Sequence, residues 1–409
     1  MQEKCLLDGI KVVELCNFVA APCTGRMLAD FGAEVIKIEI PRGDGWRGVG
    51  KSVTQTGDDE NPVFDVYNSN KKDIALDIKK PKGKEILDKL LEKADIVISN
   101  TRLKSLVKME LDPDNLRKKH PRLIYAWVGG YGEKGPEADK PAFDSSAFWG
   151  KSGFLRDMTV KTENGYPILS PYAIGDQTTS LGLLAGIFAA LYRRQITGQG
   201  ETVKVSLYNT SLWVMASMVI MTQKKYNNVW PKCRSELSPI STFYRCIDGE
   251  WVYIVINESE RYEDIFYKLL GLPDFKTNVP PEVGDISDTG KVISFLEKIF
   301  IKKTSDEWVA IFKEADIVCQ KLQHFRDVEI DEQAWANEYL EYVTLRNGEK
   351  AIMPRPPILM ESQPSIHSFS GPALGEHTEE ILKDLGFTRE QIQNFIDEEA
   401  VRTYKKLLG

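Results

Sequence analysis

The sequence predicts an α/β fold, in which a doubly wound parallel sheet forms a large domain and an α+β pattern forms a smaller one. Short apolar segments alternate with single helical segments over residues 10–128, which is typical of parallel strands joined by crossover helices. The chain has 409 residues, and single hydrophobic cores stop growing near about 250–300 residues. Two domains are therefore expected.

The first half of the chain predicts strands separated by helices. Apolar runs indicate strands at 10–16, 33–40, 73–78, 95–100 and 123–128. Between them, "CTGRMLADF" is helical and stops at Gly32, and "PKGKEILDKLLEKA" is an amphipathic helix that opens with proline. The apolar segment 177–193 predicts a long buried helix, and "TGQGETVKVSLY" after it predicts a turn and another strand.

The second half has a different pattern. The segment "STFYRCIDGEWVYIVI" (241–256) alternates on both sides of Asp248-Gly249, which predicts a β-hairpin. Helical patterns dominate 258–340, and "YVTLRNGEKAIMP" predicts a second hairpin. Two further helices are expected from Glu376 onward.

The composition argues against nucleic acid and membrane partners. Apolar residues make up 42% and charged residues 28%, and the formal charge of −7 differs from the basic stripe of nucleic-acid binders. No apolar stretch reaches the roughly 18 residues of a membrane span, and the N-terminal segment lacks a signal-peptide pattern. The six cysteines form no CxxC pair, which predicts reduced thiols and a cytoplasmic location. The four histidines match no metal-binding spacing, so no metal site is expected.

Three possible sites in the first half carry incomplete motifs. The loop "CNFVAAPCTG", before the strand that ends near Glu39, lacks the GxGxxG glycines of a dinucleotide site. Ser152 in "GKSGF" is outside a GxSxG motif. Cys23 stands at a helix start, which can lower a thiol pKa, but a small buried residue is the better interpretation.

Cations flank the expected strand ends, where open α/β sheets bind anionic ligands. The loop "PRGDGWRGVGK" (41–51) combines arginines, glycines and Trp46, and the pair Lys71-Lys72 precedes the third strand. Ordinary solvated loops have the same composition. A basic surface loop and a phosphate or nucleotide site therefore both stay open.

Asp176, in "AIGDQTTSLG", stands where a glycine-containing loop turns into the long apolar helix. Aspartate is a favoured N-cap residue, because its side chain accepts a hydrogen bond from an amide of the first turn. A carboxylate there also stays ionised, and the free amides can stabilise the oxyanion formed when it attacks a carbonyl. Gly175 allows a ligand to approach closely. The local pattern leaves cap and nucleophile both open.

A series of motifs runs in order through nearly the whole chain: "LDGIKVVEL", "LADFGAEVIKIE", "NKKDIALDIKKPKGKEIL", "ADIVISN", "GYGEKGP", "AIGDQTTSLGLLAGIFAALYRRQITGQGETVKVSL" and "GPALGEHTEEIL". Together they resemble the class III CoA-transferase family (CaiB/BaiF type). The segments "DEQAWANEYL" and "KPAFD" are similar to the branch acting on 2-hydroxy acids in amino-acid fermentation, such as phenyllactate and 2-hydroxyisocaproate CoA-transferases. The family implies an interlocked homodimer, with 1–222 and 341–409 in a large Rossmann-like CoA-binding domain and 223–340 in a small one.

The resemblance implies that Asp176, in the family's GD motif, is the nucleophile. The carboxylate attacks the thioester of a donor acyl-CoA to give a mixed anhydride and CoA thiolate, and the thiolate then attacks the aspartyl carbonyl. The donor acid leaves, an aspartyl-CoA thioester remains, and the acceptor carboxylate reverses these steps. Coenzyme A thioesters are thus expected as substrates, and no permanently bound cofactor is expected.

Positions carried over from the family imply the contacts with coenzyme A. They are Phe18, Val19, Ala20, Arg42, Asn100, Thr101, Lys108, Met109 and Lys140. Val19 stands where formyl-CoA transferase has glutamine, and "CRSELSPISTFYR" replaces that enzyme's glycine-run loop. Both departures favour a more apolar acyl pocket and argue against formyl or oxalyl substrates. Phe143, Phe148 and Trp149 are candidates to line it, although aromatic residues at such spacings are usually core.

The racemase branch of the family shares the fold and the GD aspartate, and it has a His-Asp pair before the active-site helix. The matching dipeptide here is Phe143-Asp144, and phenylalanine cannot exchange a proton with an α-carbon. The predicted activity is therefore CoA exchange between an enoyl- or aryl-enoyl-CoA and an (R)-2-hydroxy acid. An α-methylacyl-CoA racemase is the alternative, and a non-catalytic CoA-binding protein is a further one.

Overall fold

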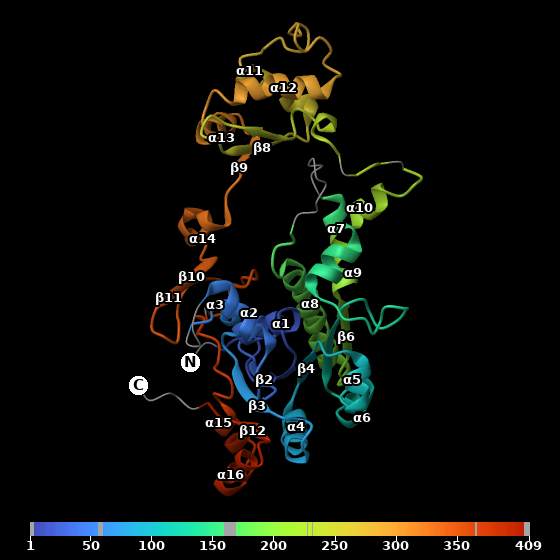
Figure 1. Ribbon diagram of the computed structural model, residues 1–409, viewed down its shortest axis with the longest axis vertical. Helices are drawn as coiled ribbons and strands as arrows, with labels where there is room; N and C mark the ends of the chain where they lie inside the picture. The colour runs from blue at the N-terminus through green and yellow to red at the C-terminus, as the bar shows by residue number, and fades with distance from the viewer. Residues whose placement is uncertain are drawn as a thin grey trace. The chain divides into compact units, whose positions relative to one another are not determined.

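The computed structural model describes residues 4–55, 60–158, 169–226, 228–230, 232–364 and 366–404. The chain divides into two compact units (Figure 1). The large unit comprises Met1–Arg156, Leu169–Ile220 and Glu332–Gly409, and the small unit comprises Asp157–Ile168 and Met221–Asp331. Within the large unit, Trp335 of α14 (Glu332–Ala336) stacks on Tyr342 of β10 (Leu340–Thr344), with ring centroids 5.0 Å apart.

A mainly parallel sheet forms the centre of the large unit. In the described residues its strand order is β12-β3-β2-β1-β4-β5-β6. The strands are β1 (Lys11–Leu15), β2 (Glu34–Glu39), β3 (Lys72–Leu76), β4 (Ile96–Ser99), β5 (Ile124–Gly129), β6 (Thr202–Ser206) and β12 (Val401–Arg402). Strands β1 to β6 are parallel, which confirms the predicted sheet. Strand β12 was not predicted; it pairs antiparallel with β3 at the edge.

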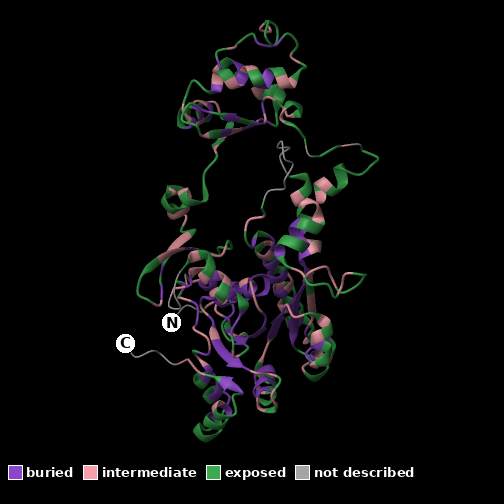
Figure 2. Cartoon of the chain, viewed as in Figure 1, coloured by how far each residue is buried: buried purple, intermediate pink, exposed green. Residues whose placement is uncertain are grey.

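Alternate residues of the strands pack on opposite faces of this sheet. Val12 and Ile96 belong to a core shared with α1 (Ala20–Asp30) and α8 (Ile174–Thr197). Their chain neighbours Val13 and Val97 belong to a core shared with α4 (Pro81–Lys93), α15 (Thr378–Asp384) and α16 (Arg389–Asp397). In Figure 2 the strands are largely buried. Helices on both faces make the sheet doubly wound.

The strand order reverses between β1 and β4, and ligands of open α/β sheets bind outside the carboxyl ends of the strands at such a point. The loops that follow these two strands are joined there. The side-chain amide of Asn100 donates to the carbonyl of Asn17 over 2.6 Å, and the amide of Asn17 donates to Asn100 Oδ1 over 3.1 Å. The predicted positions Phe18 and Asn100 therefore lie together at the switch point.

Shorter elements surround the sheet. They are α2 (Gly45–Thr54), α3 (Pro62–Asn68), α5 (Leu103–Lys108), α6 (Pro113–Lys119), the π-helical turn η1 (Asp144–Gly150), α7 (Phe154–Asp157), α9 (Leu207–Val214), α10 (Ala216–Met221) and β11 (Lys350–Pro354). Strands β10 and β11 are antiparallel, so the second predicted hairpin is confirmed. The two helices predicted after Glu376 are α15 and α16.

Helix α8 is longer than predicted, and it corrects one expectation. It begins at Ile174 rather than at 177, and by length and composition alone it could cross a membrane, although no stretch of that kind was expected. In the structure Leu183, Leu184 and Ile187 are buried in the core beside α1 and the sheet. An apolar composition of this kind is also that of a helix inside a globular core.

The small unit has a core of its own. It contains β7 (Phe243–Arg245), β8 (Trp251–Val255), β9 (Val318–Lys321), α11 (Ser259–Leu269), α12 (Thr289–Phe300), α13 (Ser305–Glu314) and the 3₁₀ turns η2 (Arg234–Glu236) and η3 (Phe325–Ile330). Antiparallel pairing of β7 with β8 confirms the hairpin predicted at 241–256. Buried rings fill the centre, where Tyr244 stacks on Phe300 with centroids 4.1 Å apart.

Candidate active site

Asp176 lies in the first turn of α8, not at its cap. Ala173 is the N-cap residue and has a left-handed backbone with φ of 63°, so Asp176 is the third residue of the helix. Among the described residues, none donates a hydrogen bond to its carboxylate. The capping alternative is therefore wrong.

A second carboxylate, Asp144, faces the same turn. It is the first residue of η1 and is 8% exposed. A Cβ atom added at Gly175 would lie 2.1 Å from Asp144 Oδ1 and 2.3 Å from Phe148 Cγ. Only glycine lets η1 approach α8 this closely. Within the described part of the chain, Asp144 Oδ1 and the buried indole Nε1 of Trp149 have no hydrogen-bond partner.

The two carboxyl groups have raised pKa values. Burial raises the pKa of Asp176 to about 7, and the negative charge of Asp144 contributes to the increase. Burial also raises the pKa of Asp144 to about 6. Raised carboxyl pKa values in one place are typical of functional sites.

The loop that carries Phe18 is held by a buried ion pair. Phe18 has a left-handed φ of 63°, and its amide donates to both carboxylate oxygens of Asp44, at 3.1 and 3.2 Å. Lys37 Nζ lies 2.9 Å from Asp44 Oδ2, and both side chains are fully buried. Asp44 also accepts the amide of Trp46 at 2.9 Å. The pair thus fixes an otherwise unfavourable backbone conformation beside the switch point.

Aromatic rings connect this loop with η1 and α3. The ring of Phe18 contacts those of Phe143 and Trp46, with centroids 5.4 and 6.4 Å apart, and Trp46 contacts Tyr67 at 6.1 Å. The Tyr67 hydroxyl accepts a hydrogen bond of 3.0 Å from Gln177 Nε2. Gln177 follows Asp176 in the chain, so this series of ring contacts ends at the first turn of α8. We call Phe143, Phe18, Trp46 and Tyr67 the aromatic row of the site.

A large cleft has Phe18 in its wall. Its volume is about 1610 Å³, and Asn17, Phe18 and Arg42 contribute to its wall. Further cations line it: Arg47, Lys51, Lys80, Arg346 and Arg402. Arg42 is exposed and forms no ion pair with any described residue, whereas Arg47 pairs with Glu39. A guanidinium in such a cleft, with no ion-pair partner in the described part of the chain, suits a phosphate group.

The other predicted coenzyme A contacts differ in how far they are buried and in their partners. The side chains of Val19 and Ala20 are buried at the start of α1. The carbonyl of Thr101 accepts the indole N–H of Trp127 at 2.9 Å. Lys108 is exposed and Met109 half-buried at the end of α5.

The loop of Lys140 lies next to α5. Lys140 is exposed, and its ammonium lies 3.2 Å from Glu137 Oε1 and over the ring of Tyr131. Arg102, just before α5, donates to the carbonyl of Asp139 at 3.3 Å. This contact brings the segment of Lys140 and the helix of Lys108 to the same side of the large unit.

The three candidate acyl-pocket residues do not lie in equivalent places. Phe143 is 58% exposed and belongs to the aromatic row. Phe148 and Trp149 are buried in a core with Phe154 and Leu207. Their burial agrees with the usual role of aromatic residues. Only Phe143 presents an open surface to a ligand.

Several cations and nucleophiles considered from the sequence are already engaged. Lys71 is buried and pairs with Glu14 at 2.8 Å, and Lys72 pairs with Glu380 at 2.8 Å. Burial raises the pKa of the Cys23 thiol, which makes it a poor nucleophile. Lys71, Lys72 and Cys23 are therefore not favoured as ligand-binding or reactive groups, and of the cations in the basic loop Arg42 stays available.

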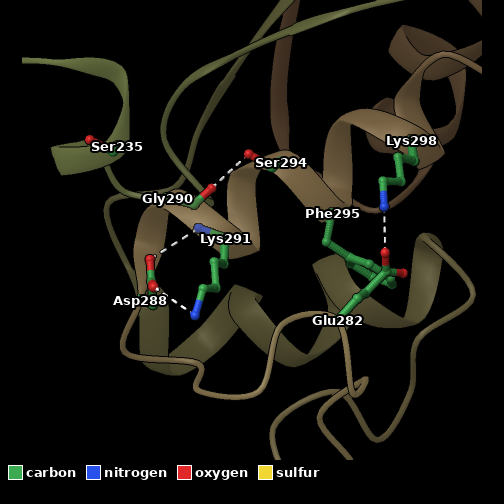
Figure 3. A pocket seen from close by; sticks show the side chains of 8 residues that line it. All are labelled: Ser235, Glu282, Asp288, Gly290, Lys291, Ser294, Phe295 and Lys298. Carbon is green, nitrogen blue, oxygen red and sulfur yellow. Dashed lines mark hydrogen bonds and ion pairs between the residues drawn. The ribbon is translucent and has the colours of Figure 1, made fainter.

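A smaller hollow on the small unit contains none of the predicted site residues. Its volume is about 360 Å³, and it lies along α12 (Figure 3). Both lysines in its wall face acids: Lys298 pairs with Glu282, and Lys291 lies 3.4 Å from Asp288. With its charges neutralised internally, this hollow offers no comparable site. Elsewhere too, the described residues form no cluster suited to a metal ion.

Comparison with known proteins identifies the family. The model of CoA-transferase family III matches residues 7–378. The chain belongs to this family. The (R)-2-hydroxy-4-methylpentanoate CoA-transferase of Clostridioides difficile is 38% identical to it over 97% of this chain and 100% of that protein. The cinnamoyl-CoA:phenyllactate CoA-transferase of Clostridium sporogenes is 36% identical over 98% of both.

This CoA-transferase family III enzyme also resembles solved structures. The crystal structure of Rv3272 from Mycobacterium tuberculosis superposes with a TM-score of 0.79 at 25% identity, covering 92% of this chain and 99% of that one. The family includes other chemistry, because human α-methylacyl-CoA racemase is 29% identical over 98% of both chains. The predicted membership and enzyme class are thus confirmed.

Four residues of the site were not assigned a role from the sequence: Lys37, Asp44, Tyr67 and Gln177. One signal was available, because Lys37 interrupts the apolar strand segment "VIKIE", and a charge in a buried strand needs a partner. Tyr67 and Gln177 lie 110 positions apart. No local pattern could have joined them.

Proposed function

We propose that this enzyme exchanges coenzyme A between an acyl-CoA and an (R)-2-hydroxy acid, with Asp176 as the nucleophile. The observation that carries the proposal is the free Asp176 carboxylate in the first turn of α8, in a family III chain whose two relatives above are named for 2-hydroxy acids. The donor is an enoyl- or aryl-enoyl-CoA, in keeping with the name of the second relative.

The proposed steps use only the carboxylate and the two substrates. An Asp176 oxygen bonds to the thioester carbonyl carbon, the C–S bond breaks, and CoA leaves as a thiolate from a mixed anhydride. The thiolate attacks the aspartyl carbonyl, which releases the donor acid and leaves an aspartyl-CoA thioester. The carboxylate of the 2-hydroxy acid then attacks the aspartyl-CoA thioester, which gives a second mixed anhydride and releases the CoA thiolate. The thiolate attacks the acyl carbonyl of this anhydride, which gives the new acyl-CoA and frees Asp176. First-turn amides of α8 stabilise the oxyanions.

The cleft beside Phe18 is the proposed seat of coenzyme A. Its 1610 Å³ exceed the ~300–1,000 Å³ of ordinary ligand pockets, so it has room for a nucleotide and a long arm. Arg42 is proposed to bind a phosphate. Phe18 belongs both to the wall of the cleft and to the aromatic row, so it connects the cleft with the surroundings of Asp176. Val19, Ala20, Asn100, Thr101, Lys108, Met109 and Lys140 remain proposed contacts, with Asn100 acting through Asn17.

Phe143 distinguishes transfer from racemisation. A racemase needs a proton acceptor on each side of the α-carbon, and the phenyl ring of Phe143 has no titratable group. Its exposed ring beside Phe18 supplies apolar surface for an acyl chain instead. This observation favours the transferase over the racemase of the same fold.

The enzyme is proposed to act as an interlocked homodimer. Large apolar side chains along α8, α9 and α10 are between 51% and 81% exposed: Tyr192, Ile196, Trp213, Val214 and Ile220. Exposed apolar patches of this kind mark protein interfaces, and a second copy is the occupant that the family resemblance implies.

All six cysteines are free thiols, which supports the proposed cytoplasmic location.

A panel of acceptor acids tests the substrate class. With one enoyl-CoA donor, we expect CoA transfer to phenyllactate or 2-hydroxy-4-methylpentanoate at least about tenfold faster, in kcat/KM, than to carnitine or formate, measured by chromatography of the CoA esters. Equal rates with formate would contradict the proposal.

The same assay in deuterated water without an acceptor detects racemisation, and α-deuteration of a 2-methylacyl-CoA would favour the racemase.

The pH dependence of transfer follows from the pKa of Asp176. The ionised carboxylate is the nucleophile, and burial raises its pKa to about 7. Protonation therefore removes activity as the pH falls, and kcat/KM is expected to rise about tenfold per pH unit below 7 and to level off above it. Asp144→Asn removes a neighbouring negative charge and should shift the midpoint to lower pH. A profile that is flat down to pH 5 in the unmodified enzyme would refute the assignment.

A further inference from the structure

Tyr67 is a buried tyrosine whose hydroxyl accepts a hydrogen bond and donates none to the described residues. It lies in α3 and is 7% exposed. Its oxygen accepts the hydrogen bond from Gln177 Nε2 at 3.0 Å. No acceptor for the phenolic proton is found among the described residues, although a buried hydroxyl normally donates as well as accepts. A ligand group is the natural acceptor for such a proton.

The phenol lies beside the first turn of α8, the turn that carries Asp176. Gln177, which holds it, is the next residue after Asp176, and the ring of Tyr67 ends the aromatic row. Burial raises the pKa of Tyr67 above its usual value, and the charges of Cys23 and Asp176 add to the rise. Tyr67 therefore keeps its proton at neutral pH and acts as a hydrogen-bond donor.

The geometry of the acceptor acid gives this donor a target. The carboxyl carbon of the acceptor acid is bonded to C2. While this carboxyl group reacts at Asp176, a substituent on C2 therefore stays within a few ångströms of the Asp176 carboxylate. The surroundings are mostly apolar, because Trp46, Phe18 and Phe143 form the rest of the row. A hydroxyl on C2 needs a polar partner there, since burying it unpaired costs free energy.

We propose that Tyr67 donates a hydrogen bond to the 2-hydroxyl oxygen of the acceptor acid and so selects 2-hydroxy acids over their unsubstituted counterparts. The inference rests on the proposed transferase function and assigns the substrate selection to one side chain. Gln177 is a positioning residue, because its amide fixes the phenol. A site built around a hydrogen bond to the substrate rejects the analogue that lacks the bonding group.

The test compares two acceptor acids in one variant. Tyr67→Phe keeps the ring in the row and removes only the hydroxyl. We expect the ratio of kcat/KM for 2-hydroxy-4-methylpentanoate to that for 4-methylpentanoate, with one enoyl-CoA donor, to fall roughly tenfold. The rate with 4-methylpentanoate should stay within about threefold of the original. Gln177→Met should lower the same ratio by a smaller factor.

Tyr125→Phe is the matched control. Tyr125 is also buried, in β5, and its hydroxyl donates to the Leu111 carbonyl at 2.8 Å, so its loss affects stability and not the ratio. An unchanged ratio in Tyr67→Phe, or equal losses with both acids, overturns the inference. If the unmodified enzyme transfers CoA to neither acid, the proposed function itself fails, and this outcome is separate from the first two.

Discussion

Asp176→Asn is expected to abolish CoA transfer, with a fall in kcat of about 10³-fold or more. The amide keeps the size and the place of the side chain in the first turn of α8, but it cannot form the anhydride. Covalent catalysis is lost as a unit when the nucleophile is removed, so little activity remains from binding alone. The measurement is initial-rate CoA exchange with the preferred acceptor acid.

A chemical trap locates the intermediate independently of the rate. Incubation with acyl-CoA and hydroxylamine should convert the aspartyl-CoA thioester to an aspartyl hydroxamate with release of CoA, and mass spectrometry should place the hydroxamate on the peptide of Asp176. Asp114→Asn is the matched control, because Asp114 is an exposed aspartate in the first turn of α6. A hydroxamate elsewhere, or full activity in Asp176→Asn, would contradict the nucleophile assignment.

Asp44→Ala is expected to lower the free energy of unfolding by about 3–5 kcal/mol, because it leaves a buried charge without its partner. Lys37 and Asp44 are both fully buried and 2.9 Å apart. The substitution also removes the acceptor of the Phe18 amide. We therefore expect weaker binding of coenzyme A as well, since Phe18 borders the cleft. Denaturant unfolding and CoA titration measure the two effects.

The double variant Lys37→Met with Asp44→Ala separates the charge from the hydrogen bonds. Removing both charges leaves no unpaired ion, so its loss of stability should be smaller than that of Asp44→Ala alone. The Phe18 amide stays without its acceptor in both variants, and the weaker CoA binding should persist. Equal stability of the single and double variants would show that the ion pair is not what holds this region.

The parts of the fold that the sequence predicted are those with a local signal. The strand segment 123–128 is a continuous apolar run, because its strand is covered on both faces. Asp248-Gly249 marks the β7–β8 hairpin through turn chemistry. Strand β12 has two residues, too few for any periodicity, and its pairing depends on β3, far away in the chain.

The residues of the site also divide into those with a local signal in the sequence and those without one. Asp176 was singled out from its place before an apolar helix and from the family motif, but the sequence could not separate a cap from a nucleophile. The backbone of Ala173 excludes the cap, because it places the N-cap three residues upstream of Asp176. Asp44 and Tyr67 act through partners on other elements, Lys37 and Gln177. Such contacts exist only after the chain has folded.

The order in which the ribosome makes the sheet gives β12 a particular role. Strand β3 is the edge of the parallel sheet until Val401 pairs with Leu76. At synthesis rates of about 5–20 residues per second, the chain between these partners takes roughly 15–65 s to emerge. During that time the edge of β3 is open, and exposed edges can pair with other chains. Chaperone demand and aggregation during expression should therefore depend on this late, short strand.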